Sequence, residues 1–437
     1  MRVKYDKNIK IVGIGVVPWS RFGLEKFLPN YKIITLNDCD FSGKNVICLS
    51  NKNIKPSFKN IVNSDDFKEI YEKNFQDYRI LTYKSFEKSD EKFISGDFNL
   101  AKNLENKAYF RRNFSNIVNF ADYKILDKNK ILKENANQLI FDNFHDHVVI
   151  QDSIMSGGRG TFKSSRGENI IQNLEKIGCF SGKGGEIIVS KLLKRSFERS
   201  IQAVICKDRI LIGPLQNQIV ADENLTNIDG GSEKFCGIQI STDDKFAKKY
   251  DEFSDIVKKI GEKIKQMGYR GVFGVDFLVS DDEIFVLEVN PRLTGATPLL
   301  TQAFSCGEIP FQLLHILELG DYDYQIEGDP KKCKESRSTI IIHGKNHSRA
   351  KIIKTLPSGI YDFSLNLISE SLEFEDLQDG QVLIQQQVSV GDEIRDGGRL
   401  FIANFKNEVL DENDKLKDEI KKIVGLIHLK IKVEEVE

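Results

Sequence analysis

Two apolar runs near the middle of the chain combine the composition of buried strands with polar side chains that such strands normally exclude. Residues 271–279 and 284–290 are rich in β-branched and aromatic residues, which predicts two strands. Each run nevertheless carries a carboxylate, Asp276 in the first and Glu288 in the second. Burying a charge is costly unless a partner compensates it, so the pattern indicates a ligand on one face of this sheet.

The spacing within the second run separates polar from apolar positions. Glu288 and Asn290 are two residues apart and therefore share a face of the strand. Leu287 and Val289 are expected to point the other way, into apolar packing. One face then carries oxygen ligands and the other belongs to the core.

The connection between the two runs decides whether their carboxylates meet. If residues 281–283 form a three-residue connection, Asp276 lies directly opposite Glu288, whereas a connection of even length would put them on opposite faces. Two facing carboxylates repel unless a cation lies between them, and with Asn290 as a neutral oxygen ligand the group suits Mg²⁺. The alternative is a solvated sheet face on which both carboxylates are ordinary surface residues.

The pattern at the amino terminus predicts a small open parallel sheet. Apolar runs at 9–15, 31–36 and 45–49 are typical of buried strands, and residues 22–27 favour a helix. The Gly13-x-Gly15 pair lacks the third glycine of a dinucleotide-binding fingerprint. We therefore expect a tight turn there and no nicotinamide cofactor.

A second unit begins near residue 103, where apolar residues recur at helical spacing. Residues 103–114 are predicted to form a charged helix, and residues 116–210 a small α+β lobe. The strands of this lobe are expected at 148–151, 186–193 and 200–205.

Helical and strand patterns alternate in the rest of the chain. Residues 243–267 predict a long amphipathic helix, and a further helix starts at 294–298 and ends near Gly320. Beyond residue 335 strands dominate, followed by a helical segment; the ranges are 338–342, 381–387, 399–405 and 413–431.

A glycine-rich segment follows the strand at 148–151. Glycine frees the backbone to turn its N–H groups toward a bound anion, and Arg159 adds a positive charge. On its own such a cluster is more often a flexible surface turn. Together with a metal-binding hairpin it predicts a cradle for nucleotide phosphates, built by Ser156, Gly157, Gly158 and Gly160.

Composition narrows the class of protein further. The 437 residues contain 63 lysines and arginines against 65 acidic residues, and no basic segment with interleaved aromatics supports nucleic acid binding. The seven cysteines include no C-x-x-C pair, which indicates reduced thiols and not a disulfide framework or zinc site. No apolar run approaches the roughly 20 residues that cross a bilayer, and no signal peptide is apparent. We expect a soluble, cytoplasmic protein of two to four packed units, without a membrane partner.

Taken together, these segments resemble the ATP-grasp superfamily, which includes biotin carboxylase, D-alanine ligase and the amino acid ligases. The similarity covers roughly residues 1–335 and is strongest over 268–297, which looks like the family's metal-binding signature. It implies an α/β and α+β fold with an N-terminal Rossmann-like domain, a two-lobed ATP-grasp core and a small β-rich C-terminal domain. The corresponding ranges are 1–104, 105–335 (with the lid lobe at about 116–210) and 336–437.

The resemblance also implies roles for individual residues. Asp276, Glu288 and Asn290 fall on the positions of the Mg²⁺ (or Mn²⁺) ligands. Arg292 falls on the arginine that contacts phosphate or the developing acyl phosphate, and Arg159 would assist it. The residues expected to contact ATP are Lys107, Gln151, Ser156, Gly157, Gly158, Gly160, Lys191, Leu193 and Glu198.

At two positions the chain departs from the family pattern. The lid strand usually ends in a lysine that reaches the phosphates, but Gln151 stands there and brings no charge. The position that often holds an adenine-side glutamate is Ser190. Either Arg159 and Lys163 supply the missing charge, or ATP binds less tightly than in other members.

The implied function is an ADP-forming ligase that activates a carboxylate as an acyl phosphate and couples it to an amine, as amino acid or peptide ligases do. Its partners would be the small-molecule carboxylate and amine substrates, and a homodimer is expected because family members are commonly dimers. Residues 294–297 either hold the substrate carboxylate through backbone donors or simply cap a helix.

Two alternatives remain open. A biotin-carboxylase-like enzyme would share the fold and the ATP site, but its tail contributes a strand arginine where the strand 339–343 offers His343, which favours an amine acceptor. His343 and His347 are also consistent with ordinary polar residues at a strand end. A non-catalytic ATP-binding protein would keep the fold and lack turnover.

Overall fold

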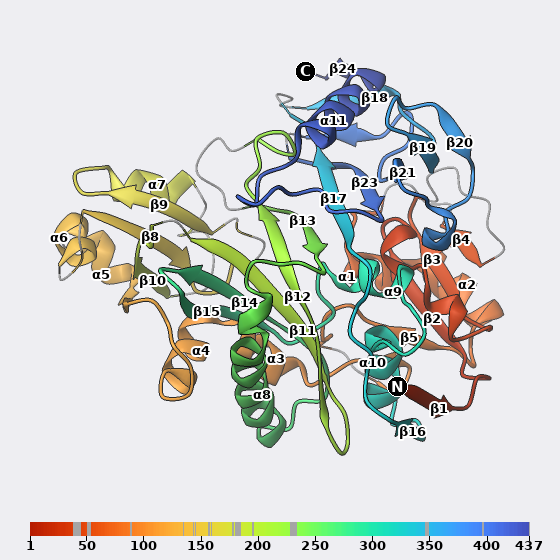
Figure 1. Cartoon of the computed structure of the whole chain (residues 1–437), viewed down its shortest axis with the longest axis horizontal. Coiled ribbons are helices and arrows are strands. Elements are labelled where there is room, and N and C mark those ends of the chain that lie inside the picture. The colour runs from red at the N-terminus through yellow and green to blue at the C-terminus, as the bar shows by residue number, and fades with distance from the viewer. Residues whose placement is uncertain are drawn as a thin grey trace.

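The computed structural model describes most of the chain, in segments that build a body and a projecting lobe (Figure 1). The described residues are 1–37, 45–49, 54–87, 90–133, 135–142, 144, 146–155, 158, 160–176, 179, 185–194, 196–227, 234–345, 349–395 and 397–436. Within them, no helix combines the length and apolar character needed to span a membrane.

The amino-terminal part forms the predicted open parallel sheet, with strand order β4-β3-β2-β5-β6. Its strands are β2 (Ile11–Gly15), β3 (Lys32–Thr35), β4 (Val46–Cys48), β5 (Arg79–Leu81) and β6 (Phe93–Ile94). Helices α1 (Phe58–Asn63) and α2 (Asp65–Asn74) precede β5, and the 3-10 turn η1 (Trp19–Arg21) follows β2. The helix expected at 22–27 is only the 3-10 turn η2 (Leu24–Lys26), because Gly23 adopts a φ of 95° and breaks the helical path.

A four-stranded antiparallel sheet with order β7-β10-β8-β9 forms the projecting lobe. The strands are β7 (Tyr123–Asp127), β8 (His147–Asp152), β9 (Thr161–Ser165) and β10 (Glu186–Lys191), and the helices are α5 (Lys128–Lys133), α6 (Ala136–Phe141) and α7 (Ile170–Lys176). Residues 197–205, expected in this lobe, instead pair with β12 and β14 of the central sheet. Side chains 199–205 are all buried, as in a strand covered on both faces.

The central sheet has the strand order β15-β14-β11-β12-β13-β17-β23-β21-β19-β20 in the described residues and runs through the whole body (Figure 1). The strands expected beyond residue 335 therefore continue the sheet that carries residues 271–290. The bounds are β11 (Phe197–Ile205), β12 (Ile210–Val220), β13 (Phe235–Ile240), β14 (Gly271–Ser280), β15 (Glu283–Asn290), β17 (Arg337–His343), β19 (Gly359–Asp362), β20 (Leu367–Ser369), β21 (Gln381–Gln386) and β23 (Arg399–Phe405).

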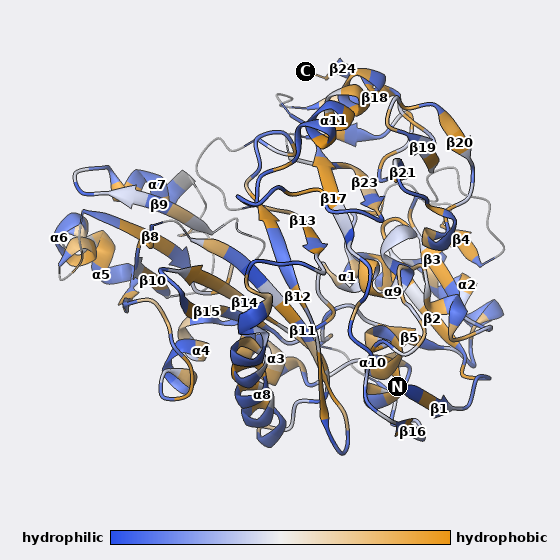
Figure 2. Ribbon diagram, viewed as in Figure 1, coloured by the Kyte–Doolittle hydropathy of each residue, from blue (hydrophilic) through white to orange (hydrophobic). Residues whose placement is uncertain are grey.

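Helix α8 (Tyr250–Gln266) covers this sheet with an apolar stripe, while its outer face is hydrophilic (Figure 2). Phe253, Val257 and Ile260 pack into one core with Phe273 and Phe277 of β14. The helix begins later than expected from its periodicity: a 3-10 turn η3 (Ala247–Lys249) precedes it, and the Asp244 carboxylate accepts a hydrogen bond from the Phe246 N–H at 2.7 Å.

Two segments predicted as single helices are each broken into two. Helices α3 (Phe98–Glu105) and α4 (Lys107–Phe114) meet at Asn106, whose side chain caps α4 by accepting from the N–H groups of residues 108 and 109. Similarly, α9 (Thr297–Gln302) and α10 (Phe311–Leu319) are separated by Gly307, with a φ of 99°, and by Pro310. The first break makes Lys107 the first residue of a helix.

Smaller elements complete the body. Strands β1 (Arg2–Tyr5) and β16 (Tyr324–Glu327) pair with each other, and β22 (Glu393–Ile394), β18 (Ala350–Lys354) and β24 (Lys432–Glu435) form a separate sheet. The 3-10 turn η4 (Phe374–Asp376) precedes β21, and helix α11 (Asp418–Lys430) corresponds to the helical segment expected over 413–431.

The hairpin β14–β15 pairs Asp276 with Glu288, but by a route that differs from the prediction. Its turn contains only Asp281 and Asp282, both with positive φ, as in the mirror-image turns that suit two-residue hairpins. A β-bulge at Leu287 inserts one extra residue between the pairs 277–286 and 276–288 and restores the expected pairing. The prediction that Leu287 faces the core is therefore wrong, because this side chain lines a cavity. Val289 is buried as predicted.

Candidate functional site

A cavity of about 360 Å³ lies between the lobe sheet and the central sheet. Strands β8, β9 and β10 line one side, and β11, β12, β14 and β15 line the other. Of the residues predicted to bind a nucleotide or metal, those on this wall are Lys107, Gln151, Gly158, Lys191, Leu193, Glu198, Asp276, Glu288, Asn290 and Arg292. Folding thus brings together candidate residues that lie up to 185 positions apart in the sequence, from Lys107 to Arg292.

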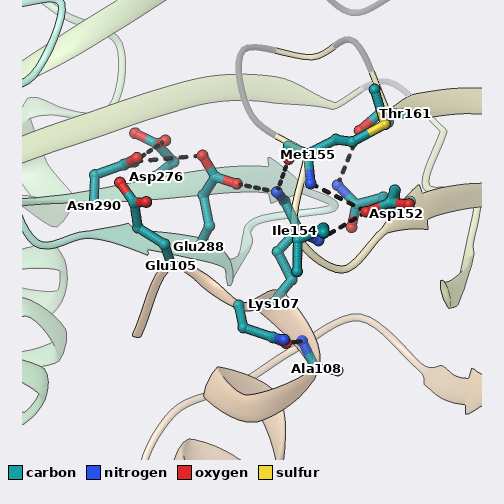
Figure 3. A network of polar contacts seen from close by, with 12 residues as sticks. Glu105, Lys107, Ala108, Asp152, Ile154, Met155, Thr161, Asp276, Glu288 and Asn290 are labelled. Carbon is teal, nitrogen blue, oxygen red and sulfur yellow. Dashed lines mark hydrogen bonds and ion pairs between the residues drawn. The ribbon is translucent and has the colours of Figure 1, made fainter. Parts of the chain in front are cut away.

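The oxygen-bearing side chains of the hairpin converge on one face of β14 and β15 (Figure 3). The Asn290 amide nitrogen donates to Asp276 Oδ2 at 2.9 Å and approaches Glu288 Oε1 at 3.4 Å. Gln218 on β12, which the sequence analysis did not single out, donates to Asp276 Oδ1 at 2.6 Å. The carboxylate pair is therefore surrounded by amide donors.

The two carboxylates differ in their charge environments. Burial raises the pKa of Asp276 well above its usual value, and the neighbouring Glu288 raises it further. Burial also opposes ionisation of Glu288, but Lys107 and Arg292 hold its pKa below the usual range. A divalent cation between the carboxylates would favour the ionised form of both, as opposite charge does for any carboxyl group.

Lys107 stands between this carboxylate pair and the start of the glycine-rich segment (Figure 3). Its ammonium group lies 3.1 Å from Glu288 Oε2 and donates to the Met155 carbonyl at 2.7 Å. Its own backbone N–H donates to the Ser153 carbonyl at 2.8 Å. A single buried cation therefore connects the hairpin to the lobe.

The donor chemistry fits a hard divalent cation. Two carboxylates with an amide oxygen within reach are ligands of the kind that Mg²⁺ prefers, supplemented by substrate phosphates. The Asn290 oxygen now accepts from Arg292 Nη2 at 2.8 Å, while its nitrogen faces the carboxylates. A half-turn of the amide would present the oxygen to the cation, so the expected ligand role of Asn290 requires this rotation.

Arg292 lies beside the carboxylate pair and donates hydrogen bonds to Glu105, Asn290 and the Leu293 carbonyl. Its Nε donates to Glu105 Oε1 at 2.8 Å, and Glu105 is also 3.5 Å from the Lys84 ammonium. The guanidinium is oriented before any ligand arrives, at the rim of the nucleotide-sized cavity.

The glycine-rich segment is only partly described. Gly158 lines the cavity, whereas Ser156, Gly157 and Arg159 lie outside the described residues. Gly160 is absent from the described lining, and a Cβ there would come within 2.6 Å of the Met155 Cβ, so its small size is required by packing. Asp152 anchors the start of the segment by accepting from the N–H groups of residues 154 and 155.

Another stretch of the wall is suited to a flat apolar group. Leu192, Leu193, Leu278 and Leu287 line it together with the side chain of Glu198 and with Lys191. The Ser190 hydroxyl is buried without a hydrogen-bond partner in the described structure, at the position where the family often has a glutamate. The departure noted at Ser190 therefore lies on the cavity wall.

Gln151 occupies the cavity wall at the other departure from the family pattern. Its Oε1 accepts from Arg111 Nη2 at 3.2 Å and its Nε2 lies 3.4 Å from Thr161 Oγ1. Arg111 is a cavity residue that the sequence analysis missed, because on α4 it reads only as one of two adjacent basic residues on a charged helix. Lys163, one of the two residues proposed to supply the missing charge, also lines the cavity.

The threonine side chains of the segment 294–297 bond to other groups of the protein. The Thr294 and Thr297 hydroxyls donate to Gln202 Oε1 at 2.8 and 2.6 Å, and Thr297 Oγ1 accepts from the Thr294 N–H at 2.8 Å. The threonine hydroxyls therefore bond to β11 and do not cap α9, whose N-cap is Ala296 and has no side-chain cap hydrogen bond. Gln202 on β11 was not predicted, since a buried glutamine in an apolar strand gives no motif.

A second, larger cavity of about 1370 Å³ adjoins the first. The amino-terminal sheet, the segment after β15 and strands β17, β21 and β23 line it. Both cavities share four lining residues, which places their junction at Phe235, Arg292, Gly295 and Arg399.

The larger cavity carries more cationic than anionic side chains. The described lining contains Arg21, Lys55, Lys84, Arg292 and Arg399 against Asp392 and Glu393. Asp392 already accepts from Asn37 Nδ2 and the Ser389 N–H, each at 2.7 Å, and Glu393 pairs with Arg349. Within the described structure no hydrogen bond or ion pair engages the Arg399 guanidinium.

His343 is not part of either described cavity lining. It is buried, its Nδ1 lies 3.2 Å from the Leu225 carbonyl, and burial lowers its pKa to about 3. In the sheet His343 pairs with Arg399 of the adjacent strand β23, so an arginine lies beside the strand segment 339–343, which itself carries none. His347 lies outside the described residues.

Comparison with protein families identifies the segment that contains this site. Residues 121–296 match the family model described as the ATP-grasp domain. The matched range extends from the lobe to the threonine segment after the hairpin and includes Gln151, Asp276, Glu288 and Asn290.

Curated relatives share limited stretches of sequence with the chain. The C-terminal section of the carbamoyl phosphate synthase large chain of Aquifex aeolicus is 22% identical over 206 residues, 43% of this chain and 36% of the relative. The carbamoyl phosphate synthase large chain of Vibrio cholerae is 24% identical over 157 residues, 36% of this chain and 14% of the relative. The chain thus matches about a third or less of these relatives' lengths.

Solved structures resemble the chain over nearly its whole length. Phosphoribosylamine–glycine ligase of Thermotoga maritima superposes with a TM-score of 0.61 and 14% identity, covering 98% of both chains. Biotin carboxylase of Campylobacter jejuni, solved as a complex with an ATP analogue, has a TM-score of 0.64 and 12% identity, covering 98% of this chain and 92% of its own. At such identities the likeness shows the fold.

Proposed function

Because the chain belongs to the ATP-grasp superfamily, we propose that it is an ATP- and Mg²⁺-dependent ligase that joins an organic carboxylate to an amine, releasing ADP. Amino acid or peptide ligation is the form of this reaction that we favour. The substrates are small molecules, and a homodimer is the assembly we expect.

One observation carries this proposal: two cavities of different character meet at Arg292. The smaller, between the lobe and the central sheet, has the carboxylate pair and the apolar wall that a metal-bound nucleotide needs. The larger opens on the other side of Arg292 and Arg399 and carries excess positive charge. A carboxylate in the larger cavity would therefore approach a phosphate in the smaller one past these two arginines.

When bound, ATP with Mg²⁺ supplies the phosphoryl group that converts the carboxylate into an acyl phosphate. Asp276, Glu288 and, after rotation of its amide, Asn290 would hold the metal. Lys107 already sits between Glu288 and the glycine-rich segment, so its ammonium can move a short distance from the carboxylate to a phosphate oxygen. Such neutralisation of charge accounts for most of the catalysis that phosphoryl transfer requires.

Arg292 and Arg399 would act on the substrate side. Arg292 is oriented by Glu105 and Asn290 and lies beside the metal group, where it can neutralise the developing acyl phosphate. Arg399 has no partner in the described structure and can accept the incoming carboxylate as its counter-ion. Phe235 lines both cavities at the same junction.

A biotin-carboxylase-like activity is the second candidate, and Arg399 is the observation that favours it. Residues 339–343 carry no arginine, but Arg399 on β23 pairs with His343 and places one beside that segment. The larger cavity, at about 1370 Å³, supports an organic acid with an amine acceptor over bicarbonate alone, so we retain the ligase as the first candidate.

ADP release in the presence of MgATP tests the proposal. The purified chain is incubated with pooled amino acids, with bicarbonate and biotin, or with neither, and products are identified by mass spectrometry. Release that depends on amino acids, with a new amide product, supports the ligase. Release that depends on bicarbonate and biotin would replace it with the carboxylase, and nucleotide binding without release under any condition would leave a non-catalytic binding protein.

A further inference from the structure

The nucleotide cavity contains a buried arginine whose hydrogen-bonding capacity is largely unused. Arg111 on α4 is 3% exposed, and its Nε and Nη1 atoms are buried without a partner in the described structure. A buried guanidinium normally has most of its five N–H groups paired, because leaving them unsatisfied is costly. An incompletely paired guanidinium in the wall of a cavity places positive charge beside whatever that cavity binds.

The surroundings of Arg111 provide packing and very little negative charge. Its guanidinium lies 5.4 Å from the ring centroid of Phe120 and 5.6 Å from that of Tyr123. Burial lowers its pKa to about 10, so it stays protonated at neutral pH, and Glu288 is the carboxylate that contributes most to stabilising its charge. Arg111 therefore brings an uncompensated positive charge toward the metal group.

The single side-chain hydrogen bond of Arg111 in the described structure goes to the position where the family usually places a lysine. Nη2 donates to Gln151 Oε1 at 3.2 Å. Because the guanidinium requires an acceptor, this bond fixes which end of the Gln151 amide faces it, and the Nε2 end is turned toward Thr161 and the cavity. Gln151 alone could donate but carries no charge.

We propose that Arg111 and Gln151 act together as the phosphate-binding group of the nucleotide site, with the Gln151 amide donating to a phosphate oxygen and the Arg111 guanidinium behind it supplying the positive charge. Arg111 is a positioning residue in this arrangement, since it acts through Gln151. The departure from the family pattern at Gln151 is then compensated from the helix α4, and no loss of nucleotide affinity is implied.

Calorimetric titration of the whole chain with MgATP and with adenosine tests this proposal. Adenosine would contact the same apolar wall but has no phosphates. Arg111→Met should weaken MgATP binding by about tenfold to a hundredfold, because it removes the positive charge behind Gln151, and leave adenosine binding unchanged. Arg112→Met is the matched control, because the neighbouring Arg112 is half-exposed and pairs with Glu186 on the outer surface.

Gln151→Lys distinguishes compensation from a structural role. In the wild-type background the new ammonium faces the Arg111 guanidinium, so little affinity for MgATP is gained. In the Arg111→Met background the same lysine should restore MgATP affinity to within a few fold of the wild type. Failure of this rescue overturns the proposal, as does an equal loss of MgATP and adenosine binding in Arg111→Met.

Arg111→Lys provides an independent test if the methionine variant does not fold. This variant keeps the charge and the aliphatic stem, so the ratio of MgATP to adenosine affinity should stay within about threefold of the wild-type ratio. A fall of about tenfold or more in that ratio would contradict the proposal, since it would assign the effect to the shape of the guanidinium and not to its charge. All of these readouts are binding constants for MgATP and adenosine, so a negative result would overturn the Arg111–Gln151 proposal without affecting the ligase proposal. Conversely, a negative ligase assay would not affect the Arg111–Gln151 proposal.

Discussion

At the scale of single residues, the pairing of Asp276 with Glu288 concentrates negative charge in a partly buried hairpin. The raised pKa of Asp276 and the lowered pKa of Glu288 show that the protein stabilises only one of the two charges by itself. Lys107 provides that stabilisation through its contact with Glu288. A divalent cation bound by this pair, as we propose, would favour ionisation of both carboxylates.

Glu288→Gln tests this arrangement with almost no change in shape. Mg²⁺-dependent ADP formation should fall by at least about a hundredfold, since a catalytic metal contributes several kcal/mol of charge stabilisation and each 1.4 kcal/mol is a factor of ten. The melting temperature should fall modestly, because the buried Lys107 ammonium loses its carboxylate partner, but the chain should stay folded at the assay temperature. Glu283→Gln, an exposed carboxylate on the same strand, is the control. Activity retained in Glu288→Gln would remove the hairpin from the list of metal ligands.

Arg399→Met tests the substrate side of the site. With an acid that supports ADP release, the KM for that acid should rise about tenfold or more, since a charge-assisted hydrogen bond is lost, while the KM for ATP stays unchanged. Arg395→Met removes an arginine outside the described lining of both cavities and should change neither value. An effect of Arg399→Met on the KM for ATP alone would place Arg399 in the nucleotide site.

At the scale of elements, a β-bulge and a helix break position two of the side chains that we propose bind the metal and the nucleotide. The bulge at Leu287 lets a two-residue turn coexist with the 276–288 pairing and adds an apolar side chain to the cavity wall. The break at Asn106 makes Lys107 the first residue of α4, which directs its side chain toward Glu288 and Met155. A regular hairpin with this two-residue turn would not pair Glu288 with Asp276, and an unbroken helix would not begin at Lys107.

Asn106→Ala should therefore affect both stability and the site. Losing the two cap hydrogen bonds should lower the free energy of unfolding by about 1 kcal/mol and weaken MgATP binding, because the turn that carries Lys107 frays. Asn106→Asp keeps the accepting oxygen and should retain most of the stability. Equal losses in both variants, measured by urea denaturation, would show that the cap does not support the helix.

At the scale of the whole molecule, the functional region is assembled by distant parts of the chain. The central sheet joins residues 197–290 to strands beyond residue 335, and the amino-terminal sheet closes the larger cavity from the other side. Asn37 contacts Asp392 and Ser389 across this closure. The larger cavity therefore exists only when the amino- and carboxyl-terminal parts are folded together.

Two buried histidines make the stability of this assembly depend on pH. Burial lowers the pKa of His315 and of His343 to about 3, so both are neutral in the folded protein, whereas in the unfolded chain they titrate near 6.5. The unfolded state then binds more protons below pH 6.5, and stability falls as the pH decreases through that value. Their contribution to stability is complete above about pH 6.5.

Urea denaturation at pH 7.5 and 5.5 should show a loss of about 1 kcal/mol for each histidine at the lower pH. His315 accepts a hydrogen bond from the Val272 N–H at 3.0 Å, and His315→Asn keeps an accepting atom without the titration. This variant should lose about half of the pH-dependent difference. An unchanged difference would mean that other groups dominate the pH response.

Prediction from sequence succeeded where the signal was local. The face shared by Glu288 and Asn290 and the parallel amino-terminal sheet follow from side-chain period and turn residues. It was wrong about continuity: the segments 103–114 and 294–320 are each two helices, and residues 197–205 belong to the central sheet. Hydrophobic periodicity does not reveal that a single capping residue ends one helix and starts the next. It also does not show which sheet a buried strand joins.

The sequence by itself determined the ligand chemistry, because carboxylates in apolar strands are too costly to bury without a partner and their spacing assigns them to one face. The tertiary structure alone decided which other groups share the site. Arg111 on a charged helix and Arg399 on a late strand carry no local motif, yet both reach the cavities around Asp276. Local pattern encodes the face that a side chain occupies, whereas its neighbours across the molecule are set by how all the elements pack together.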